Sequence, residues 1–235
     1  MKSSGPVKIT IDDAHVVSGL LDAPAGARAC CVLAHGAGAG MAHPFLAAAA
    51  AGLAQRGIAT LRYQFPYMER GSKRPDSPKV AQAAVRAAVA EAARYFPKLP
   101  LFAGGKSFGG RMTSQAQAAE PLPGVRGLLF LGFPLHAPGK PSDERGRHLA
   151  DVKVPMLFLQ GARDDFASLE LLQPLAGRLG ATLRLFEDAD HSFHVPARTG
   201  RKDAAVFAEL LDVAAGWIEA TDRLTASAPR PGSGA

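Results

Sequence analysis

Short apolar runs that end in turn residues recur along the chain, and segments with helical patterning follow most of them. Six such runs begin at about residues 29, 58, 100, 125, 155 and 181. The clearest helical segments cover residues 77–96, 169–179 and 202–220, and the first of them opens with a Ser-Pro start signal. Strands that alternate with helices predict a mostly parallel sheet covered by helices on both faces.

Two more apolar runs, at 7–11 and 15–21, lie on either side of a pair of aspartates and predict a β-hairpin. The fold class expected is therefore α/β, with eight strands in one domain over residues 1–225. At 235 residues the chain is long enough to bury such a sheet. The last ten residues, 226–235, read ASAPRPGSGA and are expected to be a disordered tail.

Composition narrows the function classes without pointing to one. The chain is 47% hydrophobic and 20% charged, and its net charge of +6 comes from basic residues dispersed among acidic ones, so no nucleic-acid partner is expected. The first ten residues have no apolar signal-peptide core, and the alanine-rich run at 45–54 is too short to span a bilayer. We expect a cytoplasmic protein with no membrane association.

The cysteines and histidines give no indication of a metal or a cofactor. Cys30 and Cys31 are adjacent in a predicted strand, which sends their side chains to opposite faces and makes buried, reduced thiols the simplest interpretation. The seven histidines are scattered, and none has ligand spacing with Cys or Glu. The sequence predicts neither a metal site nor a cofactor.

The stretch LFAGGKSFGG at 101–110 fits two motifs. Gly-Lys-Ser could end a phosphate-binding P-loop, but Pro100 stands where that loop needs its first glycine and can supply neither the turn nor the N–H donor. The same residues fit G-x-S-x-G, with Ser107 after a predicted strand and before a predicted helix, which is the setting of a nucleophile elbow. A helix-capping serine in a glycine-rich connection is the alternative.

A nucleophilic serine needs a base that is oriented by an acid, and both are available at the ends of later strands. Asp164 follows the strand MLFLQG, and His191 follows the strand LRLFED. The chain order Ser107, Asp164, His191 is that of an α/β-hydrolase triad. Asp165 is the second choice for the acid, and His194 competes weakly with His191.

An oxyanion hole would use the N–H of Phe108, after the nucleophile, and an N–H from the loop LAHGAGAG at 33–40. Ala37 or Gly38 is the expected second donor, and Gly36 is expected to line the substrate site with Gly38. His35 in the same loop is interpreted as a structural histidine rather than a base.

With these motifs the sequence resembles the α/β-hydrolase superfamily, in particular its small, uncapped, dienelactone-hydrolase-like members. The resemblance covers nearly the whole chain and rests on the segments HGAGAG at 35–40, RYQFPYMERG at 62–71, GGKSFGGRM at 104–112, LFLQGARDDF at 157–166 and DADHSFH at 188–194. It implies Ser107 as nucleophile, Asp164 as acid and His191 as base. Dienelactone hydrolases use a cysteine nucleophile, so that particular substrate is not implied.

The substrate is expected to be a small acyl compound, an ester, thioester or lactone, because residues 133–154 are too short for a large helical lid. Substrate contacts are predicted for Lys106 and Tyr67. The basic loop 68–79 and Arg111 could favour anionic substrates, although a solvated loop edge is the preferred interpretation of the loop's charges, because charged loop residues usually face water. A non-catalytic interaction subunit is the alternative function, and the oligomeric state stays open.

Overall fold

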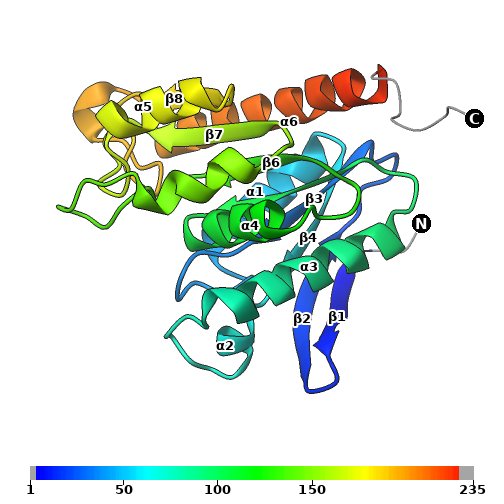
Figure 1. The fold of residues 1–235 in the computed structure, drawn as a ribbon. Helices are drawn as coiled ribbons and strands as arrows, with labels where there is room; N and C mark the ends of the chain where they lie inside the picture. Colours follow the sequence, from blue (N-terminus) through cyan, green and yellow to red (C-terminus); the bar gives the residue numbers. More distant parts are fainter. Residues whose placement is uncertain (1–3, 228–235) are drawn as a thin grey trace, which may run out of the picture.

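The structure, a computed structural model, describes residues 4–227. One eight-stranded sheet in the order β1-β2-β4-β3-β5-β6-β7-β8 runs through it (Figure 1). Its strands are β1 (Gly5–Asp12), β2 (His15–Asp22), β3 (Ala29–Ala34), β4 (Ile58–Tyr63), β5 (Leu101–Lys106), β6 (Val125–Leu131), β7 (Met156–Gly161) and β8 (Thr182–Phe186). β2 pairs antiparallel with both neighbours, and every other pairing is parallel. The expected α/β class and opening hairpin are confirmed.

Helices cover both faces of the sheet. They are α1 (Pro44–Gln55), α2 (Pro66–Glu69), α3 (Pro78–Tyr95), α4 (Phe108–Ala119), α5 (Leu169–Arg178) and α6 (Asp203–Ser227). Residues of α1 and α6 share one buried cluster, whereas residues of α3, α4 and α5 share the other. The central parallel strands are therefore buried on both sides, which explains why their sequences are continuous apolar runs rather than alternating ones.

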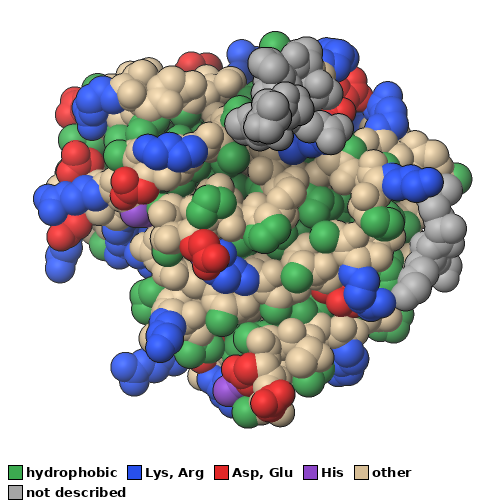
Figure 2. All heavy atoms as spheres, turned by 45° about the vertical axis from the view of Figure 1, so that its right-hand side comes forward, with side chains coloured by type: hydrophobic (Ala, Val, Ile, Leu, Met, Phe, Trp, Pro, Cys, Tyr) green, Lys and Arg blue, Asp and Glu red, His purple; other side chains and the backbone are tan. Residues whose placement is uncertain are grey.

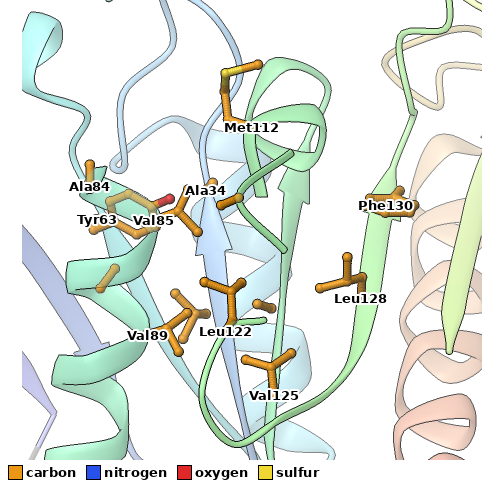
Figure 3. Packing of buried hydrophobic residues seen from close by; sticks show 14 of the residues in the cluster. Ala34, Tyr63, Ala84, Val85, Val89, Met112, Leu122, Val125, Leu128 and Phe130 are labelled. Carbon is orange, nitrogen blue, oxygen red and sulfur yellow. The ribbon is translucent and has the colours of Figure 1, made fainter. Parts of the chain in front are cut away.

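The adjacent cysteines show how the two faces divide. Cys30 belongs to the cluster beneath α3 and α4, and Cys31 belongs to the cluster beneath α1 and α6. Both are free thiols, and burial raises the pKa of Cys31 to about 12. Figure 3 shows part of the first cluster, where Val85 and Val89 of α3 lie over the strands. The two cysteines thus serve packing, as their neighbouring positions in a strand predict.

Two helices lie outside the clearest predicted helical segments, and a third ends later than expected. The alanine-rich run at 45–54 lies in α1, and the short helix α2 follows β4. α6 continues to Ser227, beyond the expected end at 220. Beyond that position Thr221 is still buried, and Asp222 forms an ion pair with Arg126 of β6. The helix enters the segment 226–235 by two residues. Residues 228–235 lie outside the described part of the chain, so disorder there stays a prediction.

The sequence predicts no large lid between β6 and β7. In the structure this connection contains only the short 3₁₀ segment Glu144–Asp151, called η1 below. The expectation of a minimal cap is therefore confirmed. Lys and Arg side chains lie interspersed with Asp and Glu on the face shown in Figure 2. Within residues 4–227, no helix has the length and apolar character needed to cross a membrane.

Candidate active site

Ser107 occupies a sharp turn between β5 and α4. Its backbone has φ 49° and ψ −116°, a conformation that non-glycine residues rarely adopt. The turn brings the chain so close to β3 that a Cβ at Gly105 would lie 2.2 Å from the Ala34 carbonyl oxygen, and one at Gly109 would lie 2.5 Å from it. The strand, strained serine and helix follow one another as a nucleophile elbow requires. Because β5 extends through Lys106, this segment is not a P-loop.

Asp164 and His191 form a hydrogen-bonded pair. His191 Nδ1 lies 2.7 Å from Asp164 Oδ2, and the carboxylate is fully buried while the imidazole is partly exposed. Since a carboxylate can only accept, Nδ1 carries the proton and Nε2 is left as the acceptor. The Phe166 ring lies 4.4 Å from the imidazole, centroid to centroid, and restricts its position. This arrangement is that of a base oriented by an acid.

Gln160 belongs to the candidate site, although the sequence reasoning did not single it out. Its Nε2 donates to Asp164 Oδ2 at 2.5 Å, and its Oε1 accepts from the Phe133 N–H at 2.8 Å. The Phe166 N–H donates to the other carboxylate oxygen at 2.8 Å. Gln160 of β7 and the backbone of Phe166 thus hold Asp164 in place, and Phe133, after the end of β6, in turn holds Gln160. A lone glutamine in the apolar run MLFLQG is the signal that could have indicated such a role.

The second choices for acid and base lie elsewhere. Asp165 is exposed, next to the buried Asp164. His194 Nδ1 lies 2.8 Å from Asp203 Oδ2 on the surface, and that hydrogen bond raises the pKa of His194. Neither residue lines the cavity that Ser107 and His191 both line.

The loop after β3 is held by side-chain hydrogen bonds. His35 Nδ1 donates to the Gly36 carbonyl at 2.8 Å, and its Nε2 accepts from the Phe65 N–H at 3.1 Å. Burial lowers the pKa of His35 to about 4. With both ring nitrogens bonded to backbone, this neutral imidazole has no nitrogen left to act as a base.

The same loop distinguishes the two candidate oxyanion donors. The Gly38 N–H donates to the Tyr67 hydroxyl at 3.0 Å, so it is engaged. Among residues 4–227, nothing accepts from the Ala37 N–H or from the Phe108 N–H at the start of α4. Two unpaired donors beside Ser107 are what an oxyanion hole needs.

Lys106 lies beside the histidine rather than pointing freely into solvent. Its Nζ donates to the His191 carbonyl at 2.6 Å and lies 5.7 Å and 5.8 Å from the ring centroids of Phe45 and Phe193. Burial lowers the pKa of Lys106 to about 8, although the nearby carboxylates oppose the shift. The ammonium group fixes the backbone at His191.

A cavity of about 380 Å³ joins these groups. Its walls include Gly36, Ala37, Lys106, Ser107 and His191, and the remaining lining residues are His35, Ala39, His43, Phe45, Leu46, Phe166 and Ser192. Of the expected contact residues, Gly36 and Lys106 line this cavity, whereas Gly38 and Tyr67 do not.

The basic loop 68–79 contributes little positive charge to this site. Lys73 and Arg74 are exposed, and Arg70 pairs with Asp76 at 2.6 Å. Within the described residues, no group of three or more His, Cys, Asp or Glu side chains could hold a metal ion.

Residues 27–219 match the family described as the alpha/beta hydrolase domain, and the chain belongs to that family. The match covers most of the sheet and includes Ser107, Asp164 and His191. The family resemblance found in the sequence is therefore confirmed.

Solved structures show the same fold at low sequence identity. A dienelactone hydrolase from Anabaena variabilis is 20% identical, with 92% of this chain and 97% of that chain covered and a TM-score of 0.73. A serine hydrolase without a lid from Xanthomonas campestris is 20% identical, with coverages of 92% and 96% and a TM-score of 0.72. A Butyrivibrio proteoclasticus protein with bound ferulic acid is 16% identical, with coverages of 88% and 98% and a TM-score of 0.67.

Proposed function

We propose that this protein is a serine hydrolase that cleaves a carboxylic ester, thioester or lactone through Ser107, His191 and Asp164. The observation that carries the proposal is that His191, hydrogen-bonded to the buried Asp164, lines one cavity together with the strained Ser107. Family membership supports the hydrolase class, and the triad assignment rests on the geometry described above.

In the first step, Ser107 Oγ attacks the substrate carbonyl carbon while its proton passes to His191 Nε2. Asp164 holds the imidazole in the required tautomer and stabilises the imidazolium that forms. The developing oxyanion lies on the N–H groups of Phe108 and Ala37, and each such donor is worth about 10²- to 10³-fold in rate. His191 then gives its proton to the leaving group, which departs and leaves an acyl-serine.

In the second step, water enters the open site. His191 Nε2 takes a proton from it, the resulting hydroxide adds to the acyl-serine carbonyl, and collapse returns the proton to Ser107 Oγ. No group outside the chain and water is needed. The short β6–β7 connection leaves the mouth of the site open, which favours small or exposed acyl substrates.

The test is intact-mass analysis after incubation with a fluorophosphonate, on the wild type and on Ser107→Ala. One covalent adduct on the wild type that is absent from the variant would support an activated Ser107. Folded wild type that takes no adduct and hydrolyses none of a panel of activated esters and thioesters would overturn the proposal in favour of a non-catalytic interaction subunit.

A further inference from the structure

A second cavity, of about 370 Å³, opens on another side of Ser107. It shares Ala37, Ser107 and Phe166 with the first cavity, and it is otherwise lined by Pro75, Asp76, Pro78, Phe108, Arg111, Pro134 and Arg145. Its walls come from the loop before α3, from α4 and from the β6–β7 connection. Two of its lining residues are arginines, and the proposed mechanism uses neither.

Within residues 4–227, both guanidinium groups lack hydrogen-bond and ion-pair partners, and the one aromatic contact is that of Arg111, whose Cζ lies 5.9 Å from the Phe108 ring centroid. No residue in the range 4–227 forms a side-chain hydrogen bond or an ion pair with Arg111 or Arg145, and the Nε of Arg111 is buried without an acceptor. The Nε of Arg62 is likewise buried without an acceptor, but Arg62 differs because its guanidinium pairs with Asp22 at 3.0 Å. Buried polar groups are nearly always satisfied in native proteins, so an unpaired guanidinium at a cavity wall indicates a missing acceptor.

The surroundings concentrate positive charge there. The pKa of Arg111 is lowered, mainly by burial and secondly by the charge of Arg145. The pKa of His148 is lowered to about 4, mainly by burial and secondly by the charge of Arg111. The one carboxylate in the wall, Asp76, is engaged: it accepts from the Tyr67 N–H at 2.7 Å and from Arg70 at 2.6 Å. The two free guanidinium groups therefore face the cavity without a compensating charge.

The lining also indicates which part of a substrate would enter this second cavity. His191 must protonate the leaving group, and His191 lines the first cavity but is not among the lining residues of the second. The leaving group therefore belongs on the His191 side, and the acyl chain belongs on the Phe108 side. Arg111 lies one helical turn from Ser107, since its N–H donates to the Ser107 carbonyl at 3.1 Å. One turn advances about 5.4 Å, a distance that a short acyl chain spans.

We propose that Arg111 and Arg145 bind a carboxylate at the far end of the substrate's acyl group, so that the substrates are monoesters or monothioesters of short dicarboxylic acids. The inference rests on the proposed serine-hydrolase function and narrows its substrate class. Guanidinium groups suit this role because they stay protonated and present planar, paired donors to carboxylate oxygens.

The test compares two esters of equal size. One is the mono-para-nitrophenyl ester of adipic acid, and the other is the same ester with its free carboxylate replaced by a primary amide. The wild type is expected to show a kcat/KM at least about tenfold higher for the acid, because a hydrogen bond between charged groups is worth at least that factor. The preference is expected in KM rather than kcat, since the distant carboxylate binds alike in the ground state and the transition state.

Arg145→Gln and Arg111→Gln should each lower the acid-to-amide ratio of kcat/KM by about tenfold. Arg147→Gln is the matched control, because Arg147 is an exposed neighbour in η1 that does not line the second cavity. If Arg111→Gln does not fold, Arg145→Gln alone decides the question. Equal kcat/KM for the two esters in the wild type, or an unchanged ratio in Arg145→Gln, would overturn the proposal.

A binding measurement separates this inference from the proposed function. Calorimetric titration of adipate into Ser107→Ala should show binding that the adipic diamide lacks and that Arg145→Gln removes. If wild type takes no fluorophosphonate adduct and yet binds adipate in this way, the hydrolase proposal fails and the carboxylate site stands. If adipate does not bind while the adduct forms, the carboxylate site is refuted and the hydrolase proposal stands.

Discussion

Replacing Asp164 by Asn tests the acid at the centre of the proposed triad. The substitution keeps the shape of the side chain but turns one acceptor oxygen into a donor NH₂. Asp164 Oδ2 accepts from both His191 and Gln160, and Oδ1 accepts from the Phe166 N–H. Whichever way the new amide is turned, its NH₂ must face a donor. Turning Gln160 instead would break its bond from the Phe133 N–H.

Two magnitudes follow from this geometry. An amide here favours the wrong histidine tautomer, which costs about 10⁴-fold in rate in triads of this type. At least one buried donor is left unsatisfied, which costs about 1–3 kcal/mol of unfolding free energy. For a domain of this size each kcal/mol lowers Tm by roughly 2–4 °C, so Tm should fall by about 2–12 °C.

The assays are the rate of fluorophosphonate labelling, followed by intact mass, and thermal unfolding monitored by circular dichroism. Asp165→Asn is the matched control, because Asp165 is the exposed neighbour and should change neither quantity measurably. If Asp164→Asn labels within tenfold of the wild-type rate, or if Asp165→Asn is the variant that loses labelling, the assignment of the acid is refuted.

Two further predictions concern the elbow and its lysine. Gly109→Ala should lose about 1–3 kcal/mol of unfolding free energy in urea, because its Cβ would lie 2.5 Å from a backbone oxygen. Gly177→Ala on α5, where the Cβ would meet open space, should instead gain about 0.5–1 kcal/mol. Equal effects of the two substitutions would contradict the close approach at Gly109. Lys106→Met tests the burial of the lysine ammonium group. The pKa of Lys106 is about 8 in the folded state and about 10.4 in the unfolded state, so the unfolded state binds more protons at pH values between these two. Wild-type stability relative to Lys106→Met should therefore rise between pH 7 and 10.5, by up to ~3 kcal/mol in urea unfolding, and an unchanged difference would contradict burial of the charge.

Sequence reasoning reached the candidate triad because all three residues stand at positions that the pattern itself marks. Ser107 follows β5 directly, whereas Asp164 and His191 lie in the short loops that follow β7 and β8, and the carboxyl ends of parallel strands meet at one edge of the sheet. Their meeting therefore requires only that the runs be strands in one sheet. The strand order and the antiparallel placement of β2 against β4 are set by long-range pairing, on which a local pattern carries no information.

The residues that local patterns missed are those whose role depends on a distant partner. Gln160 lies inside an apolar strand, and its two hydrogen-bond partners, Asp164 and the Phe133 N–H after β6, are known only from the three-dimensional structure. Arg145 stands in a polar segment, where charged residues normally face water. Only the packing of η1 against α4 places it beside Arg111. The length of α6 was underestimated for a related reason, since the ion pair of Asp222 with Arg126 of β6 cannot be read from a local pattern.

Three cationic side chains, Lys106, Arg111 and Arg145, line the two cavities beside Ser107. They differ in their hydrogen-bond partners, and this difference decides which of them can bind an anionic substrate. Lys106 donates to the His191 carbonyl and lies between two aromatic rings, so an anion that approached it would have to compete with contacts already made. The Arg111 guanidinium lies 5.9 Å from the Phe108 ring centroid, but within residues 4–227 no acceptor or carboxylate engages the guanidinium group of Arg111 or Arg145, so both keep their hydrogen-bond donors for a carboxylate. Recognition of an anionic substrate is therefore expected on the Phe108 side of the serine, whereas the His191 side selects by shape and apolar contact. In the proposed mechanism the lysine therefore orients the base, and the two arginines are expected to distinguish one acyl group from another.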